Sequence, residues 1–356
     1  MDHEEMRKKN GAFAVKGLAL LTLSGLLLLS GCSSDGKDPE STQSAAPEVT
    51  ETQPVATETA EPTAPTAEDL GLTPEEMDTV KYNIYVEMNN EIVEVLDNLY
   101  SYYEVVEYAD EFAFVPDTPY EYKYDISPFD SSLVDDALLV AEMEPAFETL
   151  DDLTVQIAEP MRALMDTFDD IYSCYDFSDN QYAKAKEFHA IIQANVDTFE
   201  SLAYTYMDAV SQLAVERTAA EEQKMLDEGR TIIYNASHAI TVTQKLLDEC
   251  YQQGVYDDNI QDLDLTPIYP LQEELTATVD AYNAAVADKN QLMAESLSGS
   301  PMYSLESLVQ AVDWMVMQVE SGSPISDPGR EYLGGIIHIE VVLSDCIDDY
   351  NSAFAE

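Results

Sequence analysis

The sequence predicts an all-α protein: an up-and-down helical bundle of about six to eight helices that follows a disordered N-terminal stalk. From residue 74 onward, apolar residues recur every three or four positions, which is the spacing of one face of a helix. No part of that region shows the sustained alternation of apolar and polar residues that indicates strands. Residues 33–73 contain no aromatic residue and are rich in Thr, Glu, Pro and Ala. We therefore expect one helical domain over residues 74–356.

Residues 1–31 have the layout of a lipoprotein signal peptide. An apolar run over residues 17–29 follows a positively charged start and precedes small residues. The run is shorter than the ~20 residues that a mature helix needs to span a bilayer. The basic residues before it are Arg7, Lys8, Lys9 and Lys16.

The apolar run ends in Leu29-Ser30-Gly31-Cys32, which resembles the lipobox of bacterial lipoproteins. The resemblance implies that Cys32 is lipidated on sulfur and becomes the first residue of the mature chain. The alternative is an ordinary signal peptide followed by a chance cysteine. Lipidation at Cys32 makes the lipid bilayer a partner and places the protein on a cell membrane, lipid-anchored and facing outside the cytoplasm.

The expected stalk, residues 33–73, follows this cysteine, and the two together form the segment 32–73. Its composition cannot bury enough apolar surface to offset the entropy lost on ordering. Prolines and self-repelling carboxylates favour an extended spacer, whose upper limit is roughly 125 Å at ~3.1 Å per residue. We expect a linker between the anchor and the helical domain.

The charge balance narrows the classes of partner. The chain has 16 Lys and Arg against 70 Asp and Glu, a formal net charge of −54. This charge repels phosphate backbones and anionic headgroups, so nucleic acid is not expected as a partner. It favours an envelope protein with a basic surface, or weakly bound divalent cations, while the plainer interpretation of such acidity is a solvated face.

Three cysteines remain besides Cys32, namely Cys174, Cys250 and Cys346. They allow at most one intramolecular disulfide and leave one thiol over. None lies in a CxxC or zinc-binding spacing, so we expect partly buried apolar thiols rather than a disulfide framework. The sequence leaves their pairing open.

The helical domain begins at Thr73-Pro74-Glu75-Glu76. Thr as N-cap, Pro at the first helical position and Glu at the third combine a capping box with a proline that leaves no amide unsatisfied. The apolar spacing then predicts one helix over about 74–108. A second helical stretch, about 131–173, contains Pro145 and Pro160, and we expect a kink or a break there.

Ser178-Asp179-Asn180-Gln181 should cap the next helix. Its apolar pattern continues to residue 253, but an unbroken helix over 180–253 would be ~110 Å long. We therefore expect a turn between 216 and 230, near Gly229. Further helices are expected from Thr266-Pro267 to about 297, around residues 305–319, and from Asp327-Pro328 toward the end of the chain.

Two passages resemble a known family. Residues 81–90, KYNIYVEMNN, look like the opening of the YiiG-like bacterial lipoproteins, the family called domain of unknown function 3829. Residues 179–189, DNQYAKAKEFH, are similar to that family's second recognisable patch. The resemblance implies an all-helical extracytoplasmic lipoprotein. Because no activity is established for the family, it implies no catalytic residue.

The same passages concentrate polar groups and provide the candidate site. If the first and third helices of an up-and-down bundle run parallel, the two asparagines of the first helix could approach the histidine of the third. The functional interpretation is a ligand or proton-handling pocket. The alternative is a helix cap with a hydrogen-bonded network that fixes helix register. The residues concerned are Asn83, Asn89, Asp179, Asn180, Lys184, Lys186 and His189.

No other pattern indicates catalysis, a cofactor or a metal centre. His238 and His338 have no second His or carboxylate three or four residues later, the spacing of a helical metal pair. The acidic run 257–264 could bind Ca²⁺ but lacks the glycine and terminal glutamate of an EF-hand, so a solvated turn is the preferred interpretation. We expect a binding or envelope-interaction protein rather than an enzyme. The alternative is a cation- or small-ligand-binding lipoprotein that uses its acidic surface or the Lys184, Lys186 and His189 patch.

Overall fold

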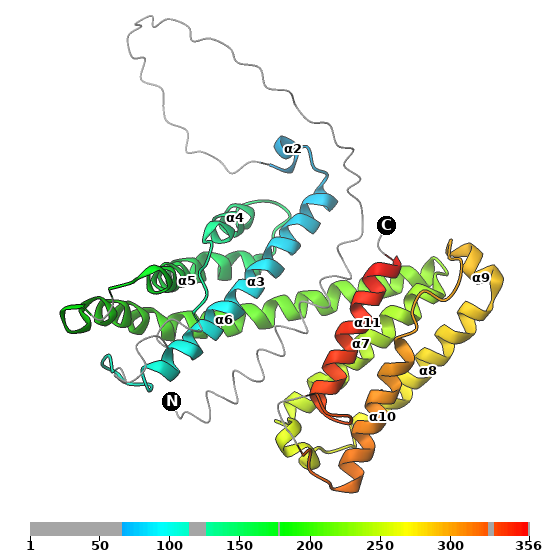
Figure 1. Cartoon of the computed structure of the whole chain (residues 1–356). Coiled ribbons are helices and arrows are strands. Elements are labelled where there is room, and N and C mark those ends of the chain that lie inside the picture. Colours follow the sequence, from blue (N-terminus) through cyan, green and yellow to red (C-terminus); the bar gives the residue numbers. More distant parts are fainter. Residues whose placement is uncertain (1–65, 114–125, 177–178, 327–330, 355–356) are drawn as a thin grey trace, which may run out of the picture.

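The computed structural model describes residues 66–113, 126–176, 179–326 and 331–354, and every regular element in them is a helix. The predicted all-α class is confirmed, and eight of the described helices have ten or more residues, within the expected six to eight. The expected signal peptide, Cys32 and residues 33–65 of the expected stalk lie outside the described residues. Figure 1 shows two groups of helices with the long α6 running between them. The helices are α2 (Ala67–Leu70), α3 (Pro74–Val105), α4 (Ser132–Ala141), α5 (Glu148–Ser173), α6 (Asp179–Asp227), α7 (Thr231–Gln252), the 3₁₀ helix η3 (Asp257–Asp262), α8 (Ile268–Ala287), α9 (Lys289–Ala294), α10 (Leu305–Ser321) and α11 (Ile336–Phe354).

The start of α3 has the predicted capping box. The Glu76 amide donates to the Thr73 hydroxyl at 3.2 Å, and the Thr73 amide donates to the Glu76 carboxylate at 2.7 Å. A second capping box, formed by Thr66 and Asp69, starts the short helix α2. Residues 67–70 of the expected stalk are therefore helical, because Thr-Ala-Glu-Asp is itself a helix-start sequence.

The predicted break in the second helical stretch occurs at Pro145, between α4 and α5. Pro160 lies inside α5 and does not end it. Because of this break, two described helices rather than one lie between α3 and α6 in the chain. With successive helices alternating in direction, α6 runs antiparallel to α3 rather than parallel to it as expected. The direction follows from the contacts, since Asp78 at the start of α3 pairs with Arg217 near the end of α6, at 2.5 Å. At the other end of the pair of helices, Tyr102 of α3 bonds to His189 of α6.

The turn predicted near Gly229 is confirmed. Helix α6 ends at Asp227 and α7 begins at Thr231. Gly229 adopts a φ of +72° there, the left-handed conformation that glycine reaches most readily and that commonly ends a helix. After the turn, α7 lies beside α8, α10 and α11 in the C-terminal group of helices in Figure 1.

The buried apolar residues form two cores. The first joins α3, α4, α5 and α6, and the second joins α7, α8, α10 and α11. Burying one large apolar side chain contributes about 1.5–3 kcal/mol, so these cores dominate the folding free energy. Representative members are Met88, Ile92, Phe168 and Phe199 in the first core and Leu246, Leu275, Met315 and Ile339 in the second.

The three cysteines of the described chain are buried free thiols, which answers the question of pairing that the sequence left open. Burial raises the pKa values of the Cys250 and Cys346 thiols to about 12. Both thiols are therefore protonated at neutral pH, which makes them poor nucleophiles.

The last helix begins at Ile336, not at Asp327-Pro328 as predicted; residues 327–330 lie outside the described residues. The backbone amide of Ile336 donates to the Asp257 carboxylate at 2.5 Å. Asp257 is buried against this helix start, which a carboxylate stabilises by accepting otherwise unpaired backbone amides. The helix start thus depends on a residue about 80 positions earlier in the chain.

Gly335 makes this cap sterically possible, which gives a first prediction. A Cβ at Gly335 would lie 2.6 and 2.9 Å from the two Asp257 carboxylate oxygens. We expect Gly335→Ala to lower the free energy of unfolding by about 1–3 kcal/mol, measured by urea denaturation, because Asp257 must move off the α11 amides. Gly299→Ala is the matched control, since a Cβ there meets no atom within 4 Å. Equal effects of the two substitutions would contradict the role of the cap.

Candidate functional site

The structure divides the polar patch predicted at the start of α6. His189 is buried, whereas Lys184 and Lys186 are exposed. The His189 Nδ1 lies 2.8 Å from the Tyr102 hydroxyl, and its Nε2 lies 3.1 Å from the Asp110 carbonyl oxygen. Both ring nitrogens are occupied by protein groups, so His189 joins α6 to the end of α3 and does not face the two lysines.

The asparagines of α3 lie far from His189. Because α3 and α6 are antiparallel, His189 meets α3 at Tyr102, which is 13 residues beyond Asn89 and 19 beyond Asn83. At 1.5 Å per residue these separations are roughly 20 and 28 Å along the helix axis. Asn89 is fully buried, and its side-chain amide has no hydrogen-bond partner among the described residues. The structure therefore does not assemble the predicted pocket.

The predicted cap of α6 also differs from expectation. The three residues Asn180, Gln181 and Tyr182 have left-handed dihedral angles, so the right-handed helix begins only after them. An N-cap stands immediately before the first helical residue, a place that neither Asp179 nor Asn180 takes. Nearby, Lys184 pairs with Asp176 at 2.9 Å on the surface. Hydrogen bonding to Lys184 lowers the pKa of Asp176.

The first family passage supplies a buried ion pair instead. Lys81 is fully buried, and its Nζ lies 2.8 Å from an Asp151 carboxylate oxygen of α5. The same ammonium donates to the Met143 carbonyl oxygen at 2.7 Å and lies 5.3 Å from the centre of the Phe147 ring. The Tyr85 hydroxyl also donates to Asp151. The ammonium thus has charged, polar and aromatic partners at once.

This buried network has a structural role. Burial, followed by hydrogen bonding to Asp151, raises the pKa of the Tyr85 hydroxyl, so it remains a donor. A buried charge left without its partner is strongly destabilising, which penalises any sliding of α3 along α5. The arrangement supports the interpretation that polar groups of this passage fix helix register.

The acidic run 257–264 is occupied by structural contacts as well. Its first part forms the 3₁₀ helix η3, and Asp257 caps α11. At the end of the run, Asp264 accepts a hydrogen bond from the Thr266 amide at 2.9 Å. Across the described residues, no three His, Cys, Asp or Glu side chains converge as metal ligands would.

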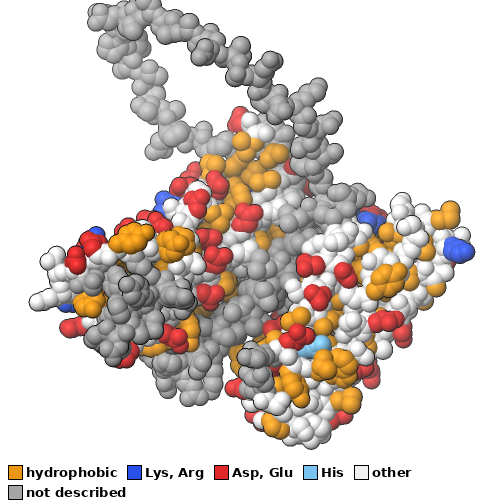
Figure 2. All heavy atoms as spheres, viewed as in Figure 1, with side chains coloured by type: hydrophobic (Ala, Val, Ile, Leu, Met, Phe, Trp, Pro, Cys, Tyr) orange, Lys and Arg blue, Asp and Glu red, His pale blue; other side chains and the backbone are white. Residues whose placement is uncertain are grey.

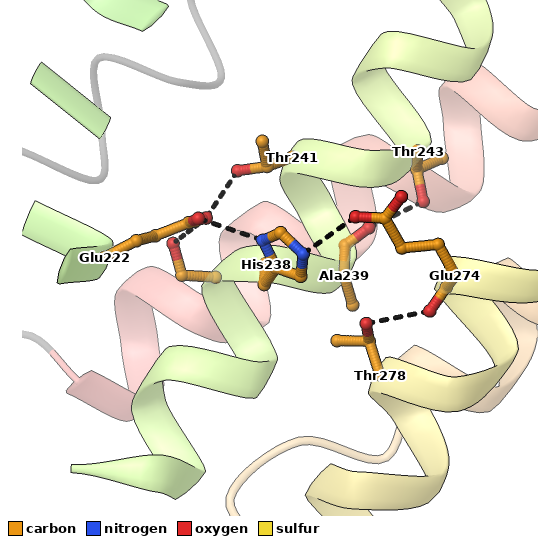
Figure 3. Close-up of polar contacts among 8 residues, drawn as sticks. Glu222, His238, Ala239, Thr241, Thr243, Glu274 and Thr278 are labelled. Carbon is orange, nitrogen blue, oxygen red and sulfur yellow. Dashed lines mark hydrogen bonds and ion pairs between the residues drawn. The ribbon is translucent and has the colours of Figure 1, made fainter. Parts of the chain in front are cut away.

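A titratable cluster that the sequence did not predict lies where α6, α7 and α8 meet. Figure 3 shows His238 of α7 between the carboxylates of Glu222 and Glu274. Its Nδ1 lies 2.9 Å from Glu222, on α6, and its Nε2 lies 3.1 Å from Glu274, on α8. The Tyr234 ring stacks on the imidazole at a centroid distance of 5.3 Å. We refer to Glu222, His238 and Glu274 as the histidine bridge.

The two carboxylates of the histidine bridge differ in their surroundings. The Glu222 side chain is 11% exposed, and it also accepts hydrogen bonds from the Thr241 hydroxyl at 2.8 Å and the Ser237 hydroxyl at 3.3 Å. The Glu274 side chain is 46% exposed and borders solvent. Hydrogen bonding to Glu222, supported by Glu274, raises the pKa of His238 above its ordinary value.

The histidine bridge can hold a proton between two carboxylates. Both imidazole nitrogens are directed at protein oxygens, so the ring has no free nitrogen with which to take a proton from a substrate. Sequence reasoning missed the bridge because it considered only neighbours on the same helix, whereas Glu222 and Glu274 lie 16 and 36 residues away.

Comparison with known proteins gives the following matches. The profile of the family described as "Protein of unknown function (DUF3829)" matches residues 76–351. The chain is also 24% identical over 224 residues to the uncharacterized protein YiiG of Escherichia coli (strain K12), a match that covers 59% of this chain and 60% of YiiG. No solved structure matches the chain.

The buried ion pair yields the second prediction. Lys81→Met leaves Asp151 without its cation, and we expect the free energy of unfolding to fall by about 3–5 kcal/mol. The matched control is Lys184→Met, which removes a lysine from an exposed pair and should leave the unfolding midpoint in urea nearly unchanged. Similar losses in both variants would contradict the register-fixing role of Lys81.

Proposed function

The chain belongs to the DUF3829 family of proteins of unknown function, and from that premise we propose that it is a lipid-anchored protein on the outer face of a bacterial membrane. The observation that carries the proposal is the sequence of residues 17–32, an apolar run that ends in Leu-Ser-Gly-Cys. Lipid on Cys32 holds the chain at the membrane, and the helical domain acts as a binding or envelope-interaction protein.

The order of segments along the chain supports this proposal. The family match begins at residue 76, within α3, so the lipobox-like sequence precedes the helical region that the family profile matches. More than 40 residues separate Cys32 from α3, enough to hold the domain away from a headgroup layer. One acyl chain binds a bilayer only marginally, so stable anchoring at Cys32 requires at least two. Among the described residues, no helix combines the length and apolarity needed to cross a bilayer.

The composition of the surface supports a role in binding. Figure 2 shows acidic side chains over the visible face and few basic ones. A surface with this charge attracts cations and basic proteins and repels nucleic acids and anionic lipids. The helical domain is therefore suited to a basic envelope partner. The alternative, binding of a cation or small ligand, draws support from the acidic surface and none from the divided Lys184, Lys186 and His189 patch.

Anchoring at Cys32 gives the third prediction. In a bacterial host grown with radiolabelled fatty acid, Cys32→Ala should lose the label that the unmutated protein carries, because the acceptor sulfur of the lipid is gone. The matched control is Cys174→Ala, which removes a buried thiol of the helical domain and should leave the label in place. Label retained by the Cys32→Ala protein would contradict the anchor.

Cation titration gives the fourth prediction and separates the two roles. The full chain in mild detergent is melted at fixed ionic strength with increasing Ca²⁺ or Mg²⁺. An acidic surface without a specific site predicts the same small, non-saturating rise in melting temperature for both ions. A saturable shift with one ion at low concentration indicates a specific site and would favour the alternative role.

A further inference from the structure

The histidine bridge stands where the two cores of the molecule are joined. The α6 residues buried in the first core extend to Ala214. Two turns later Glu222 of the same helix is buried against α7, and Met225 packs on the second core. The last two turns of α6 therefore pack with the C-terminal helices. Glu222 makes their hydrogen bonds to α7.

We propose that the histidine bridge is a pH-sensitive joint that fastens the end of α6 to α7 and α8 when His238 is protonated and loosens when His238 loses its proton. The geometry points to this role because one imidazole contacts carboxylates from two other helices, each within hydrogen-bond distance. An imidazolium donates through both nitrogens, whereas neutral imidazole carries one N–H and donates through one.

Loss of the proton therefore leaves one carboxylate facing a nitrogen lone pair. Glu222 keeps its hydrogen bonds from Ser237 and Thr241 but loses the only positive charge bonded to it among the described residues. A buried carboxylate without a cationic partner is destabilising. Glu274 borders solvent and can be hydrated instead. The penalty thus falls on the contact between α6 and α7.

The other charged or titratable groups at the joint do not replace this proton. Burial raises the pKa of Tyr234, whose ring lies on His238, and that of Tyr350, which α11 brings close to Glu222. Both tyrosines therefore stay neutral through the range in which histidine titrates. Of the charged groups near Tyr350, Glu221 raises the pKa of its hydroxyl and Arg230 lowers it.

The direction of the pH effect follows from the raised pKa of His238. Below the unfolded value, about 6.5, the imidazole is protonated in both states and the joint contributes its full stability. As the pH rises through the higher folded value, the folded state loses its proton and that contribution disappears. The joint is therefore firm in mildly acidic medium and weaker in alkaline medium.

Thermal unfolding of the full chain in mild detergent between pH 5.5 and 8.5 tests the proposal. His238→Gln keeps a hydrogen-bonding side chain that does not titrate. We expect the melting temperature of the wild type to exceed that of His238→Gln at pH 5.5, and the gap to narrow by about 2 °C or more by pH 8.5. Glu274→Gln removes one carboxylate and should move this narrowing to lower pH. A gap that is constant over the whole range would overturn the proposal.

Hydrogen exchange in the unmutated chain provides a readout that does not depend on the variants folding. After correction for the intrinsic pH dependence of exchange, protection of the amides around Glu222 should fall relative to those around Phe199 as the pH rises from 5.5 to 8.5. Phe199 lies on the same helix within the first core. Parallel behaviour of the two regions would overturn the joint, whether or not His238→Gln folds.

Discussion

Burial of the Glu222 carboxylate constrains how the two halves of the molecule fit together. Helix α6 enters the first core at Ala185 and reaches the second through its last turns. An apolar residue at position 222 would allow several docking angles, but a buried carboxylate accepts only the one at which Ser237, His238 and Thr241 meet it. This contact links α7, and with it the C-terminal group, to the end of α6.

Three cationic or titratable side chains of the chain pair with buried or half-buried carboxylates. Lys81 is fully buried beside Asp151, and Arg217 meets Asp78 with its guanidinium over the Tyr82 ring, 4.5 Å from the centre. His238 pairs with the Glu222 carboxylate in the same way. Exposed carboxylates are stabilised by water and need no such partner. Asp257, by contrast, is buried against the backbone amide of Ile336 rather than against a cation.

The sequence predicted what is local and missed what is distant. The capping box at Thr73, the break at Pro145 and the turn at Gly229 were predictable because each depends on a few adjacent residues. The antiparallel course of α3 and α6, the late start of α11 under Asp257 and the histidine bridge depend on residues tens of positions apart. The residues of the predicted patch do not come together because α6 runs antiparallel to α3. The expected parallel course assumed one helix between them, whereas the break at Pro145 makes two, α4 and α5. Periodicity fixes a helix face but not which helices meet.

Lipidation of Cys32 is the central functional claim, because it decides where the helical domain acts. The most direct test is mass spectrometry of the N-terminal peptide of the mature protein, purified from membranes of a bacterial host. The account predicts a peptide that begins at Cys32 and carries a diacylglyceryl group on sulfur. A peptide that retains residues before Cys32, or that begins at an unmodified Cys32, would contradict it.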